Sequence, residues 1–155
     1  MKLVIGNKNY SSWSMRPWLL MTQLEMPFQE ERLSFNDPDW KKQARRYAPT
    51  GLVPILIDGD VVVWDTVAIT EYLAERYPDR GVWPATTAAR ARARSIVAEM
   101  HAGFPALRAT LTMNCELRIT MQPLDRAVRR DIARIVEIWS DCRAHVDPEN
   151  APLFT

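Results

Sequence analysis

Residues 50–73 read T-G-L-V-P-I-L-I-D-G-D-V-V-V-W-D-T-V-A-I-T-E-Y-L, and this stretch decides how the chain folds. Two short apolar runs, 53–57 and 61–64, flank D-G-D, which is the pattern of a β-hairpin with a tight turn. Asp65 and Thr66 then open a helix, because both residue types cap helices and apolar residues follow at helical spacing. The stretch predicts a strand, a turn, a second strand and a helix in direct succession.

Pro54 stands at the start of the first of these strands, where it removes a backbone donor from the sheet. A proline is tolerated at the first residue of a strand or on an edge strand, and a cis Val53–Pro54 bond explains the sharp turn into the strand. Two interpretations stay open. The proline lies at an edge and meets no ligand, or it turns the preceding backbone outward to pair with an extended peptide ligand.

Upstream of this stretch the chain alternates between strand and helix patterns. The apolar run K-L-V-I-G at 2–6 predicts a buried strand, and helical spacing follows as far as Pro27, with Ser14 expected as the N-cap. Residues 28–35 predict a second strand, and a short basic helix containing Trp40 follows it. The predicted order is βαβαββα.

Strand signals end after the linker-like segment P-D-R-G-V-W-P-A-T at 78–86. One helix is expected from about Thr87 to Leu117, with a bend near Gly103, and another from Pro123 onward. The predicted organisation is an α/β domain at residues 1–78, a linker at 79–86 and an all-α helical domain at 87–155.

The composition of the 155-residue chain narrows the class of protein. A net charge of +1 provides no field that would attract nucleic acid or an anionic membrane, so neither is expected as a partner. Cys115 and Cys142 lack the spacing of a disulfide framework or a zinc site, and no metal is expected. With no targeting pattern and no membrane-length apolar run, we expect a cytoplasmic protein.

The loop Y-S-S-W-S-M-R at 10–16 places three hydroxyls between the first strand and the first helix. Serines at such a position often only cap a helix or turn the chain. A serine hydroxyl at a helix N-terminus can also donate to an anion without itself ionising. The loop contains no cysteine, so sulfur chemistry there would need a thiol from a ligand.

With three motifs in place, the chain resembles the cytosolic glutathione S-transferases, above all bacterial members and the zeta class with its S-S-C-S loop. The motifs are Y-S-S-W-S-M-R, T-G-L-V-P-I-L before a hairpin, and W-D-T-V-A-I-T-E-Y-L at the start of the next helix. The resemblance implies a thioredoxin-like N-terminal domain that binds glutathione as co-substrate, and a helical domain that helps to bind a small electrophile. It also implies a homodimer with a role in detoxification.

By this resemblance Ser11 occupies the catalytic position, Ser12 is the next candidate, and Trp13 replaces the cysteine of the zeta loop. The thiol of glutathione has a pKa near ~8.5, so the protein has to stabilise the thiolate at neutral pH. A serine hydroxyl that donates to the sulfur does so. The choice between Ser11 and Ser12 stays open.

The resemblance also implies the residues that bind glutathione. The backbone at Val53 and Pro54 binds the cysteinyl unit, and Asp65 and Thr66 bind the charged γ-glutamyl end. Leu52 stands where many relatives carry Lys or Gln, so Trp40 or a neighbouring lysine is expected to supply the missing contact.

Members of this family continue for several tens of residues beyond the position of Thr155, so the helical domain is expected to be incomplete. Exposed apolar surface would then favour dimerisation or disorder near residues 146–155. The leading hypothesis is a glutathione transferase. The alternatives are a cis-trans isomerase of the maleylacetoacetate type and a non-catalytic module that binds glutathione or dimerises.

Overall fold

The computed structural model describes residues 1–120 and 122–144, and it confirms the predicted order βαβαββα. The strands β1, β3 and β4 are short because each apolar run ends near a turn-forming residue, and helices begin where the apolar spacing changes from two to three or four residues. The elements of this region are β1 Lys2–Ile5, α1 Ser12–Gln23, β2 Gln29–Arg32, α2 Trp40–Arg45, β3 Ile55–Asp58, β4 Val61–Trp64 and α3 Thr66–Arg76. A 3-10 turn at Pro78–Arg80 and the helices α4 Thr87–Ala102, α5 Pro105–Thr110 and α6 Arg126–Ala144 follow.

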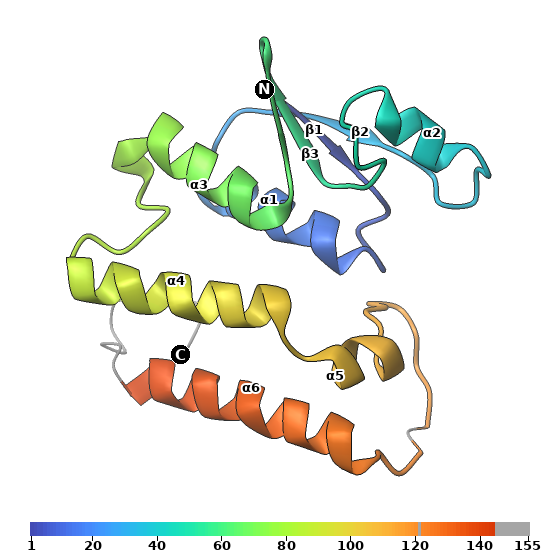
Figure 1. Cartoon of the computed structure of the whole chain (residues 1–155), viewed down its shortest axis with the longest axis vertical. Coiled ribbons are helices and arrows are strands. Elements are labelled where there is room, and N and C mark those ends of the chain that lie inside the picture. The colour runs from blue at the N-terminus through green and yellow to red at the C-terminus, as the bar shows by residue number, and fades with distance from the viewer. Residues whose placement is uncertain (121, 145–155) are drawn as a thin grey trace. The chain divides into compact units, whose positions relative to one another are not determined.

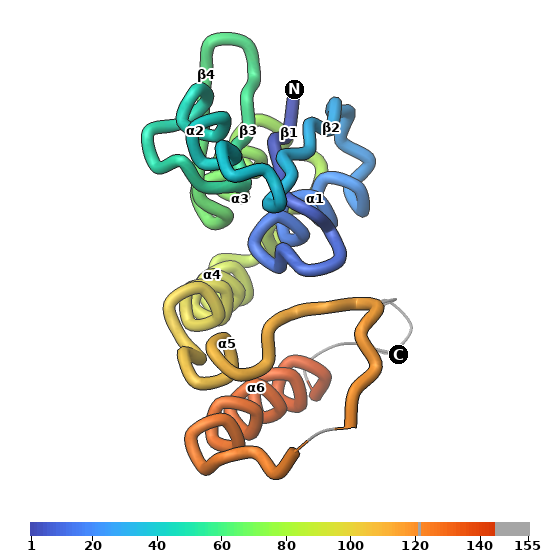
Figure 2. The backbone as a smooth tube through the Cα atoms, turned by 90° about the vertical axis from the view of Figure 1, so that its right-hand side faces the viewer, coloured from blue at the N-terminus to red at the C-terminus, as the bar shows by residue number. Residues whose placement is uncertain are grey.

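The four strands form one mixed sheet in the order β2-β1-β3-β4 (Figure 2). β1 pairs in parallel with β2, with Leu3 opposite Glu30, and antiparallel with β3, with Leu3 opposite Leu56. The parallel pair needs a crossover, which α1 supplies, whereas β3 and β4 need only a tight turn. Gly59 occupies that turn with φ 60, a backbone conformation that glycine adopts without steric cost.

Helices cover both faces of this sheet (Figure 1). On one face Leu3 and Ile5 of β1 pack with Met21 of α1 and with Ile69 and Leu73 of α3. On the other face lies a smaller cluster that includes residues of β1, β3 and α2: Val4, Leu33, Ala44, Ala48 and Ile55. The near-continuous apolar run of β1 is therefore explained by burial on both faces.

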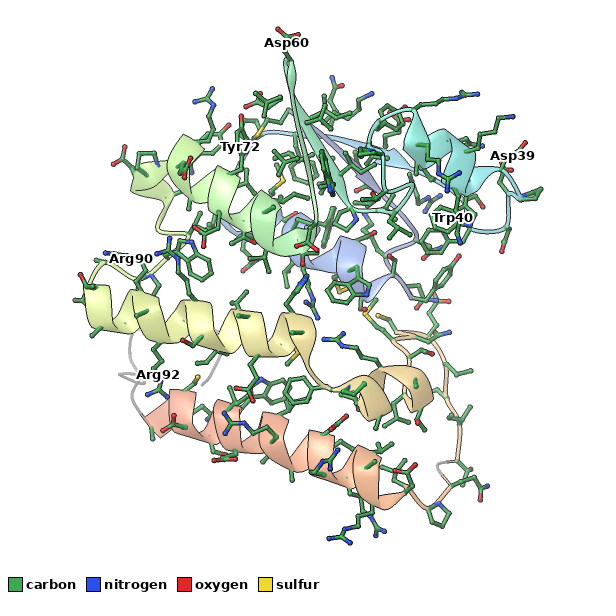
Figure 3. The ribbon with its side chains drawn as sticks, viewed as in Figure 1. Asp39, Trp40, Asp60, Tyr72, Arg90 and Arg92 are labelled. Carbon is green, nitrogen blue, oxygen red and sulfur yellow. The ribbon has the colours of Figure 1, made fainter. Side chains whose placement is uncertain are left out.

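The predicted features of the hairpin are confirmed. The Val53–Pro54 peptide bond is cis, and β3 begins at Ile55, so Pro54 precedes the strand rather than interrupting it. Asp60 lies at the tip of the β3–β4 turn (Figure 3). The hairpin registers Ile55 opposite Trp64.

The chain divides into two compact units. The first comprises residues 1–101 with 113–116 and therefore includes nearly all of α4, and the second comprises 102–112 with 117–155. Within the first unit, Arg94 of α4 donates to both carboxylate oxygens of Glu71 of α3, at 2.9 and 2.8 Å. Such bidentate pairs fix orientation as well as adding energy.

The arginines of α4 do not all lie on one side of the helix (Figure 3). Arg90 donates to the backbone carbonyls of Pro84 and Ala85, which anchors the segment before α4. Arg90 and Arg92 project from different sides of the helix (Figure 3), as residues two apart on a helix do.

The expected single helix from Thr87 to Leu117 is wrong. α4 ends at Ala102, and α5 begins at Pro105 and ends at Thr110. Phe104 between them has φ 65, which no helical residue adopts, and its side chain is buried in the second unit. The chain therefore stops and restarts its helix instead of bending, because Pro105 lacks a backbone donor and is favoured at a helix start.

In the second unit, α6 supplies the cap of α5. Asp131 of α6 is buried, and its Oδ2 accepts the backbone N–H groups of Ala106 and Leu107, each at 3.1 Å. Val128 and Ile138 of α6 are also buried, whereas Trp139 is 56% exposed. The exposure of Trp139 shows that the apolar stripe of α6 is only partly covered. The segment expected to be disordered, 146–155, lies outside the described residues.

Within residues 1–120 and 122–144, no helix combines the length and apolar character needed to cross a membrane.

A polar cluster joins β1, β2 and the end of α2. Glu31 of β2 accepts from the Tyr47 hydroxyl and pairs with the Lys2 ammonium at 2.9 Å. The Tyr47 hydrogen bond, followed by that of Lys2, lowers the pKa of the Glu31 carboxyl below its usual value. The same contacts raise the pKa of Tyr47 and of Lys2.

Glu31 should make stability depend on pH. Its folded-state pKa lies below that of the unfolded chain, so its contribution is present above about pH 4.3 and is lost as the pH falls through the lower folded-state value. Glu31→Gln should therefore lower the free energy of unfolding at pH 7, and the difference from the unmodified chain should shrink below about pH 4. Denaturant unfolding at several pH values measures this, and a difference that does not change with pH contradicts it.

Candidate functional site

The loop between β1 and α1 holds its serines in a defined hydrogen-bond arrangement. The Asn7 carbonyl accepts the backbone N–H groups of Tyr10 and Ser11, so the turn closes at Ser11 and α1 begins at Ser12. Ser11 is therefore the N-cap residue, although its side chain makes no capping hydrogen bond. The Ser11 Oγ instead lies 2.9 Å from the Ser14 Oγ.

The expectation that Ser14 is the N-cap is wrong, because the helix begins two residues earlier. Ser14 lies inside α1 with no exposed surface, and its Oγ accepts the backbone N–H of Gly6 at 3.0 Å. Gly6 is the residue that follows β1, so this hydrogen bond joins the end of the strand to the first turn of the helix. Ser11 is 7% exposed, and Ser12 is half-buried.

A cavity of about 550 Å³ opens in the first unit. It brings together four of the predicted glutathione-binding residues, Val53, Pro54, Asp65 and Thr66, although they come from two separate motifs. Its other lining residues are Trp13, Thr50, Leu52, Trp64 and His101. The volume is in the range of small-molecule sites.

Three predicted residues are not among those that line the cavity. Ser11 and Ser12 directly precede Trp13, which does line it. Trp40 lies at the start of α2 (Figure 3), where its ring contacts Phe35 with centroids 4.7 Å apart. The Trp40 side chain is thus held by an aromatic contact outside the cavity.

Asp65 has a special backbone as well as a special side chain. Its φ is 77, a backbone conformation that residues other than glycine rarely adopt, and it is the N-cap of α3. The Asp65 Oδ1 accepts the Val67 N–H at 2.9 Å, which confirms the predicted capping role. Its second oxygen, Oδ2, lies 3.4 Å from the His101 Nε2.

His101 is the functional candidate that sequence reasoning missed. Its other ring nitrogen, Nδ1, lies 3.4 Å from the Thr66 Oγ1, and its ring meets that of Trp13 edge-on at 5.2 Å. The chain has only two histidines, and this one lies in the last turn of α4, which ends at Ala102. That position gave no sign that His101 lies beside residues 65 and 66.

The cavity therefore combines an apolar wall with a small polar group. Leu52, Trp13 and Trp64 supply apolar surface, and Asp65, Thr66 and His101 supply a carboxylate, a hydroxyl and an imidazole. This arrangement suits a ligand that carries both a charged end and an apolar part. Among the described residues no group of His, Cys, Asp or Glu side chains is suited to hold a metal ion.

The class defined by this fold is a thioredoxin-like domain that contains a cavity of small-molecule size, followed by a helical region. Residues 10–76 match the family model of the glutathione S-transferase N-terminal domain. This match covers the serine loop, the hairpin and α3.

Curated relatives match parts of this chain. Dichloromethane dehalogenase of Methylorubrum extorquens is 40% identical over 65 residues, which is 41% of this chain and 23% of that protein. Glutathione S-transferase Z1 of Arabidopsis thaliana is 48% identical over 48 residues, 31% of this chain and 20% of the relative. Glutathione S-transferase GstB of Escherichia coli is 32% identical over 95 residues, 59% of this chain and 45% of the relative. The aligned part of the chain thus spans less than half of these relatives.

Solved structures share the fold over nearly the whole chain. A glutathione transferase homologue from Burkholderia, with bound glutathione, has a TM-score of 0.67 at 20% identity and covers 96% of this chain and 67% of that one. A bacterial zeta-class maleyl pyruvate isomerase has a TM-score of 0.61 at 21% identity, covering 93% and 62%. The family match over residues 10–76, the sequence relatives and the shared fold all point to similarity with glutathione S-transferases.

Substitutions at Asp65 should separate its capping role from its backbone conformation. Asp65→Asn keeps a capping acceptor and tolerates positive φ, so the free energy of unfolding should change by less than about 0.5 kcal/mol. Asp65→Gly loses the cap but adopts positive φ without strain. Asp65→Ala loses the cap and keeps the strained backbone, and these two losses should lower its free energy of unfolding by about 2 kcal/mol. Denaturant unfolding should give the order Asn, Gly, Ala from most to least stable, and an alanine variant as stable as the asparagine variant contradicts this explanation.

Proposed function

We propose that the chain binds glutathione in the cavity of its first unit and activates the thiol for attack on a small electrophile. The observation that carries this proposal is that Val53, Pro54, Asp65 and Thr66 line one cavity. Two solved structures with the same fold are described as containing bound glutathione, which supports it. The proposed activity is that of a glutathione transferase.

The γ-glutamyl end of glutathione carries an ammonium and a carboxylate, and α3 offers a partner for each. The Asp65 carboxylate suits the ammonium, because its Oδ2 remains after Oδ1 has accepted the Val67 N–H. The Thr66 hydroxyl and the backbone N–H groups that begin α3 suit the carboxylate. Val53 lies before the first paired residue of β3, Ile55, so its backbone is placed to pair with the cysteinyl unit.

In this proposal Ser11 donates its hydroxyl hydrogen to the sulfur of bound glutathione. Ser11 is the N-cap of α1, so the positive end of that helix also favours the thiolate. The thiol proton leaves to solvent, and Ser11 stays neutral. The sulfur lone pair then forms a bond to the electrophilic carbon, and the leaving group departs with its bonding electrons. Ser12 remains the alternative donor.

The zeta-type isomerisation is the second candidate activity, and the 49% identity over 37 residues to a glutathione S-transferase of the zeta class from Euphorbia esula favours it. In that reaction the thiolate adds to a conjugated double bond, rotation follows, and the thiolate leaves again. The same bound thiolate serves both reactions, so the electrophile decides between them.

We also infer a homodimer in the cytoplasm with a role in detoxification. We further infer domains at residues 1–78 and 87–155, joined by a linker at 79–86.

A contact between glutathione and Trp40 requires the ligand to extend out of the cavity toward α2. The third candidate, a module that binds without catalysis, predicts retention on immobilised glutathione with no turnover.

Asp65→Asn should weaken the binding of glutathione by about tenfold, because an ion pair with the ammonium becomes a neutral hydrogen bond. Isothermal titration with glutathione measures the affinity. The matched control is Thr22→Ala, a hydroxyl on α1 that bonds the Trp18 carbonyl and does not line the cavity. Equal affinity of Asp65→Asn and the unmodified chain contradicts the assigned γ-glutamyl site.

Ser11→Ala should lower the rate of conjugation of an aryl chloride by roughly 10- to 1000-fold, the scale of losing one anion-stabilising donor. Glutathione affinity should change little, because the ground-state contacts lie elsewhere. Steady-state kinetics of Ser11→Ala and Ser12→Ala measure the effect. If Ser11→Ala is fully active and Ser12→Ala is inactive, the donor to the sulfur is Ser12 and not Ser11.

A further inference from the structure

Ser14 makes a buried hydrogen bond that the proposed chemistry has not yet used. Its Oγ accepts the Gly6 N–H at 3.0 Å and lies 2.9 Å from the Ser11 Oγ. Ser14 has no exposed surface, and Ser11 is 7% exposed, so water has little access to either hydroxyl. The three groups form a short chain from the end of β1 to the N-cap of α1.

Each hydroxyl has one hydrogen to donate and two lone pairs, which limits how this chain can be arranged. Only one hydrogen lies between Ser11 and Ser14. If Ser11 donates it, the single hydrogen of Ser11 is used, and none remains for a sulfur. If Ser14 donates it, Ser14 can still accept from Gly6, and the hydrogen of Ser11 becomes available to an acceptor outside the pair.

We propose that Ser14 is a positioning residue that donates to Ser11 and so directs the Ser11 hydroxyl toward the sulfur of bound glutathione. This inference rests on the proposed function. The hydrogen-bond chain runs from the Gly6 N–H to Ser14, then to Ser11, then to the thiolate. Each donor in such a chain polarises the next one, which strengthens the last hydrogen bond.

The backbone leaves Ser14 able to donate to Ser11 once the thiolate accepts the hydrogen of Ser11. The Gly6 N–H cannot reverse, so it always donates, and it occupies one lone pair of Ser14. The Phe35 ring leaves no room for a side chain at Gly6, since a Cβ at position 6 would lie 2.2 Å from it. The Ser14 oxygen is thus placed by the sheet, and its hydrogen can turn toward Ser11.

The test is the pKa of the glutathione thiol in its complex with the full 155-residue chain, followed by thiolate absorbance near 240 nm across a pH titration. Ser14→Ala should raise this pKa by about one unit toward the free value of ~8.5, and lower turnover at neutral pH about tenfold, with recovery at higher pH. The affinity for glutathione should change less than about twofold, because Ser14 does not touch the ligand. Thr22→Ala controls for a lost hydroxyl on the same helix.

A purely structural role for Ser14 gives a different result. Ser14→Ala would then lower the melting temperature and leave the pKa of the bound thiol unchanged, which overturns the proposal. The double variant Ser11→Ala/Ser14→Ala should have the same thiol pKa as Ser11→Ala alone, because Ser14 acts only through Ser11. Additive effects of the two substitutions also overturn it.

Two outcomes separate this inference from the proposed function. If the unmodified chain does not bind glutathione, or if Ser11→Ala leaves the thiol pKa unchanged, the proposed function is wrong. The role proposed for Ser14 then falls with it. If Ser11→Ala raises the pKa and Ser14→Ala does not, only the role of Ser14 fails. Should Ser14→Ala not fold, Ser14→Cys keeps a weaker donor of similar size. It should raise the thiol pKa by a smaller amount, and an unchanged pKa refutes the inference.

Discussion

The first unit depends on the burial of β1 on both faces of the sheet. Leu3, Val4 and Ile5 are consecutive and have no exposed surface, so their side chains alternate between two apolar clusters. Burying each such side chain stabilises the fold by about 1.5–3 kcal/mol. Residues of α1 and α3 on one face, and of α2 on the other, contribute to that burial. The position of Gly6 at the end of β1 follows from this burial. The hydrogen bond from the Gly6 N–H to Ser14 then ties the first turn of α1 to the end of this strand.

Local patterns explain why most of the fold was predictable. A hairpin signal, a proline before a strand and an acidic cap before an apolar stripe each act over a few residues, and all three are confirmed between Val53 and Val67. The starts and ends of helices elsewhere depend on contacts that spacing does not reveal. Ser11 caps α1 because the Asn7 carbonyl closes the turn before it. The helix likewise breaks at Phe104, whose side chain is buried and which belongs to the second unit, whereas nearly all of α4 belongs to the first.

The same distinction applies to the cavity. Val53, Pro54, Asp65 and Thr66 were predictable because each belongs to a short motif with its own physical reason. His101 was not, since it lies 35 positions from Thr66 and meets it only through folding. Trp40, which the missing polar residue at Leu52 suggested, contacts Phe35 and does not line the cavity, so its role in binding stays a prediction. A residue proposed to fill a gap in a pattern has weaker support than one proposed from its own chemistry.

Asp65 meets demands that few side chains satisfy together. Its backbone has positive φ, its Oδ1 caps α3, and its Oδ2 faces His101 at 3.4 Å. Glycine would satisfy only the backbone, and asparagine would satisfy the backbone and the cap without the charge. On the proposed function, the ammonium of glutathione and the imidazole of His101 both approach the same oxygen. On the same proposal, binding of the ligand at Asp65 is linked to the position of His101, which is how α4 contributes to binding glutathione.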